Sequence, residues 1–350
     1  MQATEAVALA DIAGTPRSGS RRGAVEIGAL VVGAAAVVVS TMVLTSANGL
    51  VRVGIVIAGI ALLWWVGETW LRRRHPGLGI DLVMSIAWLL LIGALSAFAD
   101  LLPLPEGRVA ARALDEPVLA RPDLFSGHPL GTDRHGLDLL SGIAYGGRVS
   151  LVVGLGATAV GVVLGGSVGL CAGYFRGRLD RVVGLLTDSM LAFPPLILLL
   201  GLVTVRGSSI TVVTAGLAVL SIPSFVRLAR ANAISLANRE FVLAARALGA
   251  KPSRILVRDI LPNAVGPIFS YAVVIVAALI VAEASLSFLG LSVQRPNPTW
   301  GNMIAAGEAS YDRHPHLVAV PSVCLFLTVF ALNRVGEKLH PLHGGTDRNR

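Results

Sequence analysis

Residues 238–263 read NREFVLAARALGAKPSRILVRDILPN, a polar and cationic segment with strongly apolar sequence on both sides. Asn238 is a residue type that caps helices, and Gly249 followed by Pro252 supplies stop signals. Between them one apolar stripe recurs at helical spacing: Phe241, Ala244, Ala245 and Leu248. The segment therefore predicts a short amphipathic helix that is too short and too charged to cross a membrane.

Two interpretations of this short helix are open from the pattern alone. It could be a docking surface for a cytosolic partner, because an Arg-bearing helix between apolar segments would be energetically unfavourable without a binding partner. It could also lie in the headgroup layer and bind only lipid.

The composition places the whole chain among membrane proteins. Mean hydropathy is +0.73, hydrophobic residues make up 54% and charged residues 14% of 350 residues, whereas soluble domains are about 25% charged. A span needs roughly 20 apolar residues. We therefore predict an all-α polytopic membrane protein with about eight transmembrane helices, the first two forming a tight hairpin, near residues 24–46, 50–70, 80–100, 148–172, 182–204, 209–229, 264–290 and 317–335.

The basic residues predict the orientation of these spans. The net charge of +8 could suggest nucleic acid, but the cations are not clustered with aromatic residues and instead flank apolar runs. With the N-terminus in the cytosol, most of the 29 cations fall on the cytosolic side, which predicts cytosolic N- and C-termini and no nucleic-acid partner. Residues 101–147 and 292–316 then form long extracytoplasmic segments that could cover a pore or contact an extracytoplasmic partner.

Two acidic residues fall inside apolar runs. A charge at the bilayer centre costs about 2.5–3.5 kcal/mol even on the mild insertion scale, so Asp188 and Glu283 are candidates for the translocation path or the bundle interior. For Asp188 a position near the membrane interface is also open, because Arg181 is close in sequence. Pro194 and Pro195 predict a kink in the fifth span. Glycines of the fourth span predict close helix packing: Gly154, Gly161, Gly165, Gly166 and Gly169.

No catalytic residues or cofactors are predicted. Neither lysine stands in a phosphate-binding Gly-Lys-Ser/Thr sequence, so ATP hydrolysis is not expected on this chain. The pairs His314/His316 and His340/His343 lack acidic or cysteine companions at ligand spacing, so no metal site is predicted. His128 would be the first residue to test if a transition metal were the substrate.

Ordered motifs over residues 128–336 carry a family resemblance. They are HPLGTD (128–133), GGRVSL (146–151), AGYF (172–175), DSMLAFP (188–194), the 238–263 segment, EASLSFLGL (283–291) and PTWGNM (298–303). Their order resembles the C-type permease subunit of dipeptide, oligopeptide and nickel ABC importers. The 238–263 segment is similar to the cytoplasmic coupling loop of these permeases, with Leu243 where the family has Glu, and Leu137 stands where the family usually has Arg.

The resemblance implies a type I ABC importer permease fold with two extra N-terminal helices. It implies one half of a path for di- or oligopeptides, a homologous permease as heterodimer partner, cytosolic ATP-binding subunits and an extracytoplasmic substrate-binding protein. ATP-driven closure of the ATP-binding subunits would move the short helix and rock the attached spans. The implied ATPase-coupling residues are Glu240, Ala244, Ala245, Gly249, Ile260, Leu261 and Pro262.

The expected organisation has five parts in the cell membrane. They are a cytosolic tail (1–23), an extra transmembrane hairpin (24–75), the first family helix with its extracytoplasmic loop (76–147), the permease domain (148–336) and a cytosolic tail (337–350). The alternatives are a nickel or other small-solute permease, an ATPase-independent secondary transporter and, third, a membrane-embedded enzyme.

Overall fold

The computed structural model describes residues 79–123 and 127–342, with side chains up to residue 339. The chain divides into two compact units at residues 83/84, and the arrangement below is that of the second. The predicted N-terminal tail (1–23), hairpin (24–75) and first two spans (24–46 and 50–70) lie outside the described residues, as does the end of the C-terminal tail.

In the described ranges the regular structure is helical, apart from one isolated bridge between Thr132 and Asp138. The short elements are η1 (Ala110–Arg112), η2 (Gly161–Gly165), α10 (Glu240–Ala247), α11 (Pro252–Ile255), η3 (Leu256–Ile260) and α13 (Trp300–Glu308). The longer helices are α4 (Ile80–Ala97), α5 (Leu139–Val160), α6 (Gly166–Phe175), α7 (Gly177–Ala192), α8 (Pro195–Arg206), α9 (Ile210–Leu236), α12 (Leu261–Phe288) and α14 (His316–Leu342).

Five helical stretches in the described part are long and apolar enough to cross a membrane: Ile80–Ala97, Leu139–Phe175, Ile210–Leu236, Pro252–Phe288 and His316–Leu339. The pair α7 and α8 passes the same test jointly. These six stretches correspond to the six predicted spans from residue 80 onward. Three begin clearly earlier than predicted: α5–η2–α6 by nine residues, α7–α8 by five and α11–η3–α12 by twelve.

The predicted kink at Pro194 and Pro195 is a sharp break. α7 ends at Ala192, α8 begins at Pro195, and the two helix axes differ by 81°. Pro195 occupies the first turn of α8, where its missing N–H leaves no hydrogen bond unmade. Phe193, the residue before Pro194, is held in an extended conformation (φ −78°, ψ 129°), which stops α7 from continuing.

Close backbone contact joins α6 to α9. A Cβ atom built on Gly165, Gly169 or Gly173 would lie well inside 3.0 Å of the carbonyl oxygens of successive turns of α9. This four-residue repeat of small residues lets the two backbones touch. Predicted packing therefore holds for Gly165 and Gly169, whereas Gly166 faces open space, with nothing within 4 Å of a built Cβ.

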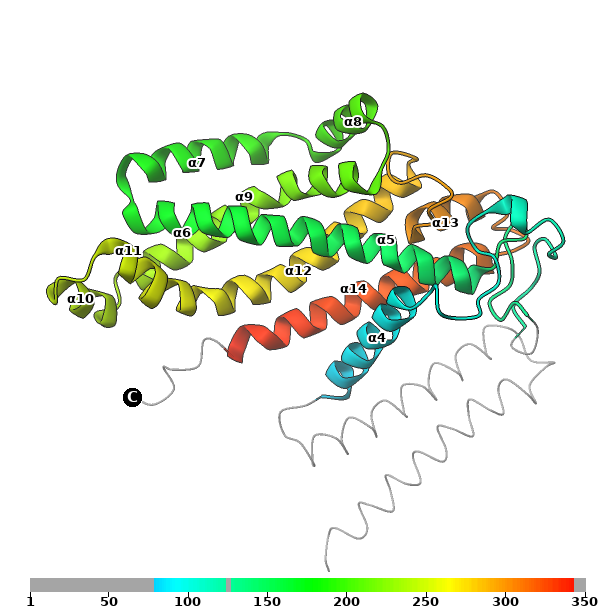
Figure 1. Cartoon of the computed structure of the whole chain (residues 1–350), viewed down its shortest axis with the longest axis horizontal. Helices are drawn as coiled ribbons and strands as arrows, with labels where there is room; N and C mark the ends of the chain where they lie inside the picture. Colours follow the sequence, from blue (N-terminus) through cyan, green and yellow to red (C-terminus); the bar gives the residue numbers. More distant parts are fainter. Residues whose placement is uncertain (1–78, 124–126, 343–350) are drawn as a thin grey trace, which may run out of the picture. The chain divides into compact units, whose positions relative to one another are not determined.

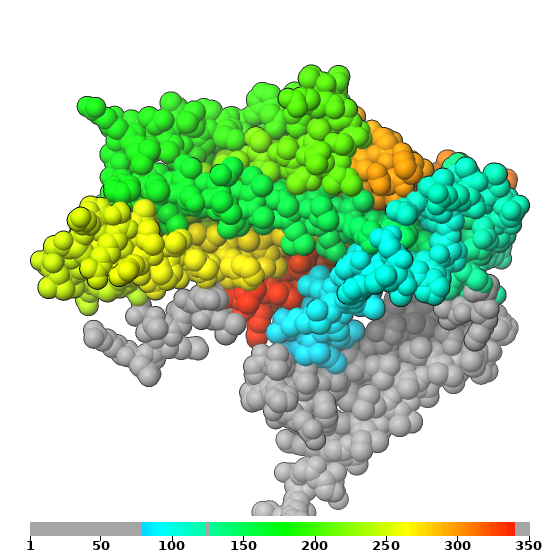
Figure 2. Space-filling model, in the orientation of Figure 1, coloured from blue at the N-terminus to red at the C-terminus, as the bar shows by residue number. Residues whose placement is uncertain are grey.

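The second unit is a bundle with irregular structure at both ends (Figure 1). α5–α6, α9 and α12 pack on one another, and α14 packs along α12. α10 and α11 lie at one end of the bundle, while residues 101–138 and α13 lie at the other (Figures 1 and 2). The indole N–H of Trp88 on α4 donates to the hydroxyl of Thr328 on α14 at 3.1 Å.

Candidate functional site

The short amphipathic helix predicted after residue 238 is α10, which directly precedes the long helix of α11, η3 and α12. Its N-cap is Arg239 in an extended conformation, without a side-chain capping bond. The predicted capping role of Asn238 is therefore wrong. The Asn238 side-chain oxygen instead accepts a hydrogen bond from the Arg176 guanidinium at 3.1 Å, which ties the entry to α10 to the end of α6.

Gly249 shapes the exit from α10. Its N–H donates to the carbonyl of Arg246, and the N–H of Ala250 donates to the carbonyl of Ala245, both at 3.0 Å. These two bonds form a Schellman turn, which requires a left-handed residue at the first position after the cap. Gly249 has φ +76°, so a residue type without a Cβ is favoured there.

One face of this segment is anchored in the bundle. Val242, Ile255 and Ile260 are fully buried in a single apolar cluster with residues of α6, α9 and α12. Burial of one such side chain contributes about 1.5–3 kcal/mol, so the segment is held firmly against the spans. Through this cluster α10 and the η3 turn pack directly against α9 and α12.

The opposite face of α10 is exposed. Leu248 is 88% exposed, Leu243 51% and Phe241 41%, and Ala244 is also exposed. The predicted apolar stripe is thus largely exposed, with only Ala245 partly buried, and Leu243 adds an exposed apolar side chain on another side of the helix. The buried anchor Val242 was missed in the sequence analysis, although its three-residue spacing puts it next to Ala245, the partly buried member of the stripe.

The remaining predicted coupling residues are divided between surface and core. Glu240, Leu261 and Pro262 are exposed, whereas Ile260 is buried. A shallow depression lies beside them on α11 and η3, and we name it the 249–258 depression. It is lined by Gly249, Ala250, Lys251, Ser253, Arg254, Val257 and Arg258.

Glu283 lies in the bundle interior. Its side chain is fully buried on α12, and it accepts hydrogen bonds from the hydroxyls of Ser150 on α5 (2.9 Å) and Ser292 (3.1 Å). Ser287 and Thr299 close the network nearby, with their hydroxyls 2.6 Å apart. The carboxyl group thus joins α5, α12 and the segment that enters α13.

Asp188 does not lie in the bundle interior of this chain, which corrects that part of its prediction. Its side chain is 71% exposed, and it forms an ion pair with Arg227 on α9 at 2.9 Å. About two turns earlier on α7, Asp180 forms an ion pair with Arg230 of α9 through both of its carboxylate oxygens. The two pairs fasten α7 along α9.

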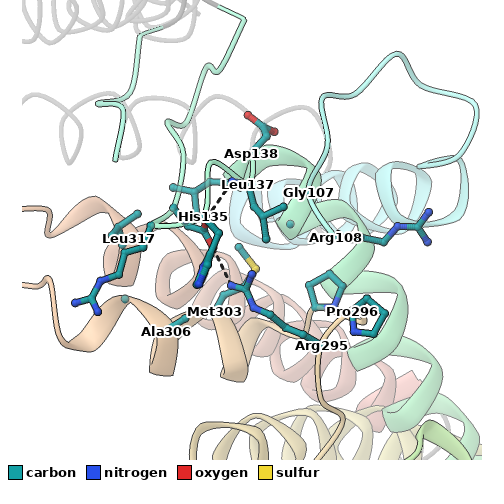
Figure 3. A pocket seen from close by; sticks show the side chains of 16 residues that line it. Gly107, Arg108, His135, Leu137, Asp138, Arg295, Pro296, Met303, Ala306 and Leu317 are labelled. Atoms are coloured by element: carbon teal, nitrogen blue, oxygen red, sulfur yellow. Dashed lines mark hydrogen bonds and ion pairs between the residues drawn. The ribbon is translucent and has the colours of Figure 1, made fainter. Parts of the chain in front are cut away.

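A narrow cleft opens at the other end of the bundle (Figure 3). Arg295 donates to Asp133 at 2.8 Å across it, and Arg134 donates to Ser310 at 2.6 Å. The floor is apolar, with Leu137 and Met303 among its lining residues. These contacts join the two long segments, 101–138 and 292–316, into one cover.

His128 fixes this cover to α5. Its Nδ1 lies 3.1 Å from Asp138, the N-cap of α5, and its Nε2 lies 3.0 Å from Glu116. Burial opposes the charge on the ring, but the hydrogen bonds that the ring donates to Asp138 and Glu116 outweigh it and raise the pKa of His128 above 6.5. Both ring nitrogens are therefore committed to carboxylates.

Comparison with known proteins identifies the family. Residues 161–342 match the family model described as binding-protein-dependent transport system inner membrane component. The chain belongs to this family. This permease is therefore a multi-pass inner-membrane subunit of a transport system, and the matched range contains both α10 and the whole of the long helix that follows it.

Individual relatives agree with this assignment. The permease is 39% identical over 214 residues to the glutathione transport system permease protein GsiD of Pectobacterium atrosepticum, covering 61% of this chain and 71% of the relative. It is 37% identical over 212 residues to the dipeptide transport system permease protein DppC of Alkalihalophilus pseudofirmus, covering 61% and 70%. A solved inward-facing structure of the MetNI methionine ABC transporter gives a TM-score of 0.45 at 18% identity, covering 57% and 96%.

Proposed function

We propose that this permease subunit forms half of the path of an ATP-driven importer of dipeptides or short oligopeptides. The substrate class is supported by the relatives, which are named as glutathione and dipeptide permeases at 37–39% identity. The family description names a binding-protein-dependent system, so a self-sufficient secondary transporter does not fit. The second half of the path would come from a homologous permease.

The observation that carries the coupling part of the proposal is the two-faced burial of α10. Its inner face is locked to the spans through Val242, and its outer face leaves Phe241, Leu243 and Leu248 exposed. Large exposed apolar side chains on a charged, non-spanning helix fit a protein partner better than solvent. That partner is a cytosolic ATP-binding subunit, whose closure would push on α10 and rock α9 and α12.

The proposed orientation puts α10 in the cytosol with both chain termini. It is supported by the distribution of cations in the described residues, because Arg176, Arg178 and Arg181 and the cations of residues 239–258 gather at the α10 end of the bundle (Figure 1). The cleft and the cover at residues 101–138 and 292–316 would then face the binding protein.

The test is site-specific crosslinking in the full transporter. The native Cys171 and Cys324 are replaced by Ala, and Ala244→Cys is compared with Ser285→Cys, an exposed position on α12 far from α10. We expect Ala244→Cys alone to capture the ATP-binding subunit. Equal capture at both positions, or none at Ala244→Cys, would remove the coupling role.

Transport assays separate the substrate classes. Uptake of labelled dipeptides and tripeptides is measured beside uptake of labelled nickel, each with an active and a hydrolysis-deficient ATP-binding subunit. We expect peptide uptake that depends on hydrolysis. Nickel uptake without peptide uptake would replace the peptide proposal by the nickel alternative.

A further inference from the structure

Three cations line the 249–258 depression without any acidic residue in its lining: Lys251, Arg254 and Arg258. All three side chains are exposed, and none forms a hydrogen bond or an ion pair with the part of the chain that the structure describes. Nearby cations differ, since Arg227 and Arg230 pair with Asp188 and Asp180.

The spacing of these cations is unfavourable in the isolated subunit. Lys251 is the N-cap of one continuous helix, Pro252–Phe288, and Arg254 and Arg258 follow it at three- and four-residue intervals. Like charges so spaced repel each other. An anionic group seated in the depression would remove this repulsion and use all three donors.

The depression is continuous with the exposed face of α10. Gly249 and Ala250 belong to its lining, and Leu248, the most exposed of the α10 leucines, directly precedes them. At the other side Val257 lies in the lining and is 58% exposed. The surface therefore combines apolar side chains with a cationic hollow.

This combination favours a protein partner over a lipid headgroup. The helix from Pro252 to Phe288 has 37 residues, whereas a span needs about 20. Between Asp259 and Glu283 the sequence has no charged residue, so Lys251 and Arg254 lie before the apolar stretch by one to two helical turns. Unpaired cations alone would not identify a docking surface, because Arg178 and Arg181 on α7 also lack ion pairs within the described residues.

We propose that Lys251, Arg254 and Arg258 bind an acidic segment of the ATP-binding subunit, beside the apolar contact made by α10. The proposal rests on the proposed function and adds the chemistry of the partner surface: an apolar pocket for Phe241 and Leu248, bordered by carboxylates.

The experiment measures capture of the ATP-binding subunit by the full membrane complex in nanodiscs, at low and high salt. The test variant is the neutralising triple Lys251→Gln, Arg254→Gln, Arg258→Gln. Its matched control is Arg178→Gln with Arg181→Gln, which removes two unpaired cations from α7. Leu248→Asp disrupts the apolar contact independently.

We expect the triple variant to weaken capture by about tenfold or more at low salt, and to lose most of the salt dependence. The α7 control should behave as the parent protein. If Leu248→Asp weakens capture and the triple variant does not, the charged contact is wrong and the proposed function stands. If neither weakens capture, the proposed function fails as well.

Phospholipid analysis of the same preparations tests the other candidate ligand of the 249–258 depression, an anionic lipid headgroup. If the triple variant binds the ATP-binding subunit normally but loses co-purifying anionic phospholipid, the depression is a headgroup site and the proposal is overturned.

Discussion

The hydroxyl of Ser150 on α5 donates to the carboxyl group of Glu283 on α12 at 2.9 Å, in a site from which solvent is excluded. Ser292 donates to the other carboxyl oxygen from the segment after α12. A single side chain therefore fixes the distance between two spans and the position of the chain that enters α13. Buried polar groups of this kind are costly when one partner is removed.

We predict that Glu283→Ala destabilises the subunit by about 2–4 kcal/mol, because the cavity and two unpaired buried hydroxyls remain. The measurement is the unfolding free energy or midpoint of the solubilised complex. Ser285→Ala is the control, since Ser285 is exposed on the same helix and bonds only to its own helix at Val281. It should change stability by less than about 0.5 kcal/mol, and an equal loss in both variants would contradict the role of Glu283.

The α6–α9 contact gives a matched pair of glycine substitutions. Gly169→Ala would place its Cβ against the carbonyl of Val226 and 2.9 Å from the Cβ of Ala229, so we predict a loss of about 1–3 kcal/mol from overpacking. Gly166→Ala has nothing within 4 Å and should be neutral or stabilising by up to about 1 kcal/mol. Thermal unfolding of both variants decides this, and equal midpoints would show that α6 and α9 do not touch.

The hydrogen bonds of His128 with Asp138 and Glu116 should make the free energy of unfolding depend on pH. Because Asp138 and Glu116 raise the pKa of His128 despite its burial, the native state holds a proton that the unfolded state begins to lose near pH 6.5. The contribution of His128 to the free energy of unfolding is therefore fully present below pH 6.5. It disappears as the pH rises through the raised pKa of the folded state.

His128→Gln tests this dependence. We predict that it lowers the melting midpoint most at about pH 5.5–6.5, and that the difference from the parent protein shrinks toward pH 9. His135→Gln is the control, because the side chain of His135 is 57% exposed. A difference that stays constant with pH would mean that His128 contributes only by packing.

Sequence patterns predicted the spans well where apolar periodicity was uninterrupted, as in α9. They placed the start of the span that contains α12 too late, at residue 264, because Pro252 read as a stop signal for the short helix before it, and a second proline, Pro262, follows. In the structure both occupy first-turn positions, and a π-helical turn at Leu256–Ile260 joins the two pieces into one helix. Whether a proline ends a helix or starts one depends on this local adjustment, which composition does not reveal.

The candidate site was predicted in part. Helical spacing identified α10 and its apolar stripe, but could not say which face the bundle would cover, because Val242 and the stripe are both apolar. Helix α13 was missed inside residues 292–316, although Thr299 and Asn302 form a capping box that could have indicated it. One partner of Glu283, Ser150, lies 133 positions away in the sequence, and no local pattern connects the two residues.

The turn at Gly249 sets the path of the chain between α10 and α11. Nothing lies within 4 Å of a Cβ built there, so bulk alone is not the obstacle; the backbone conformation at φ +76° is. Gly249→Val should strain the Schellman turn by about 1–2 kcal/mol and shift α10 against its anchor, so we predict loss of peptide uptake with normal membrane insertion. Gly249→Asn, which tolerates the left-handed conformation, should retain most uptake. Equal uptake in the two variants would show that the turn does not position α10 for coupling.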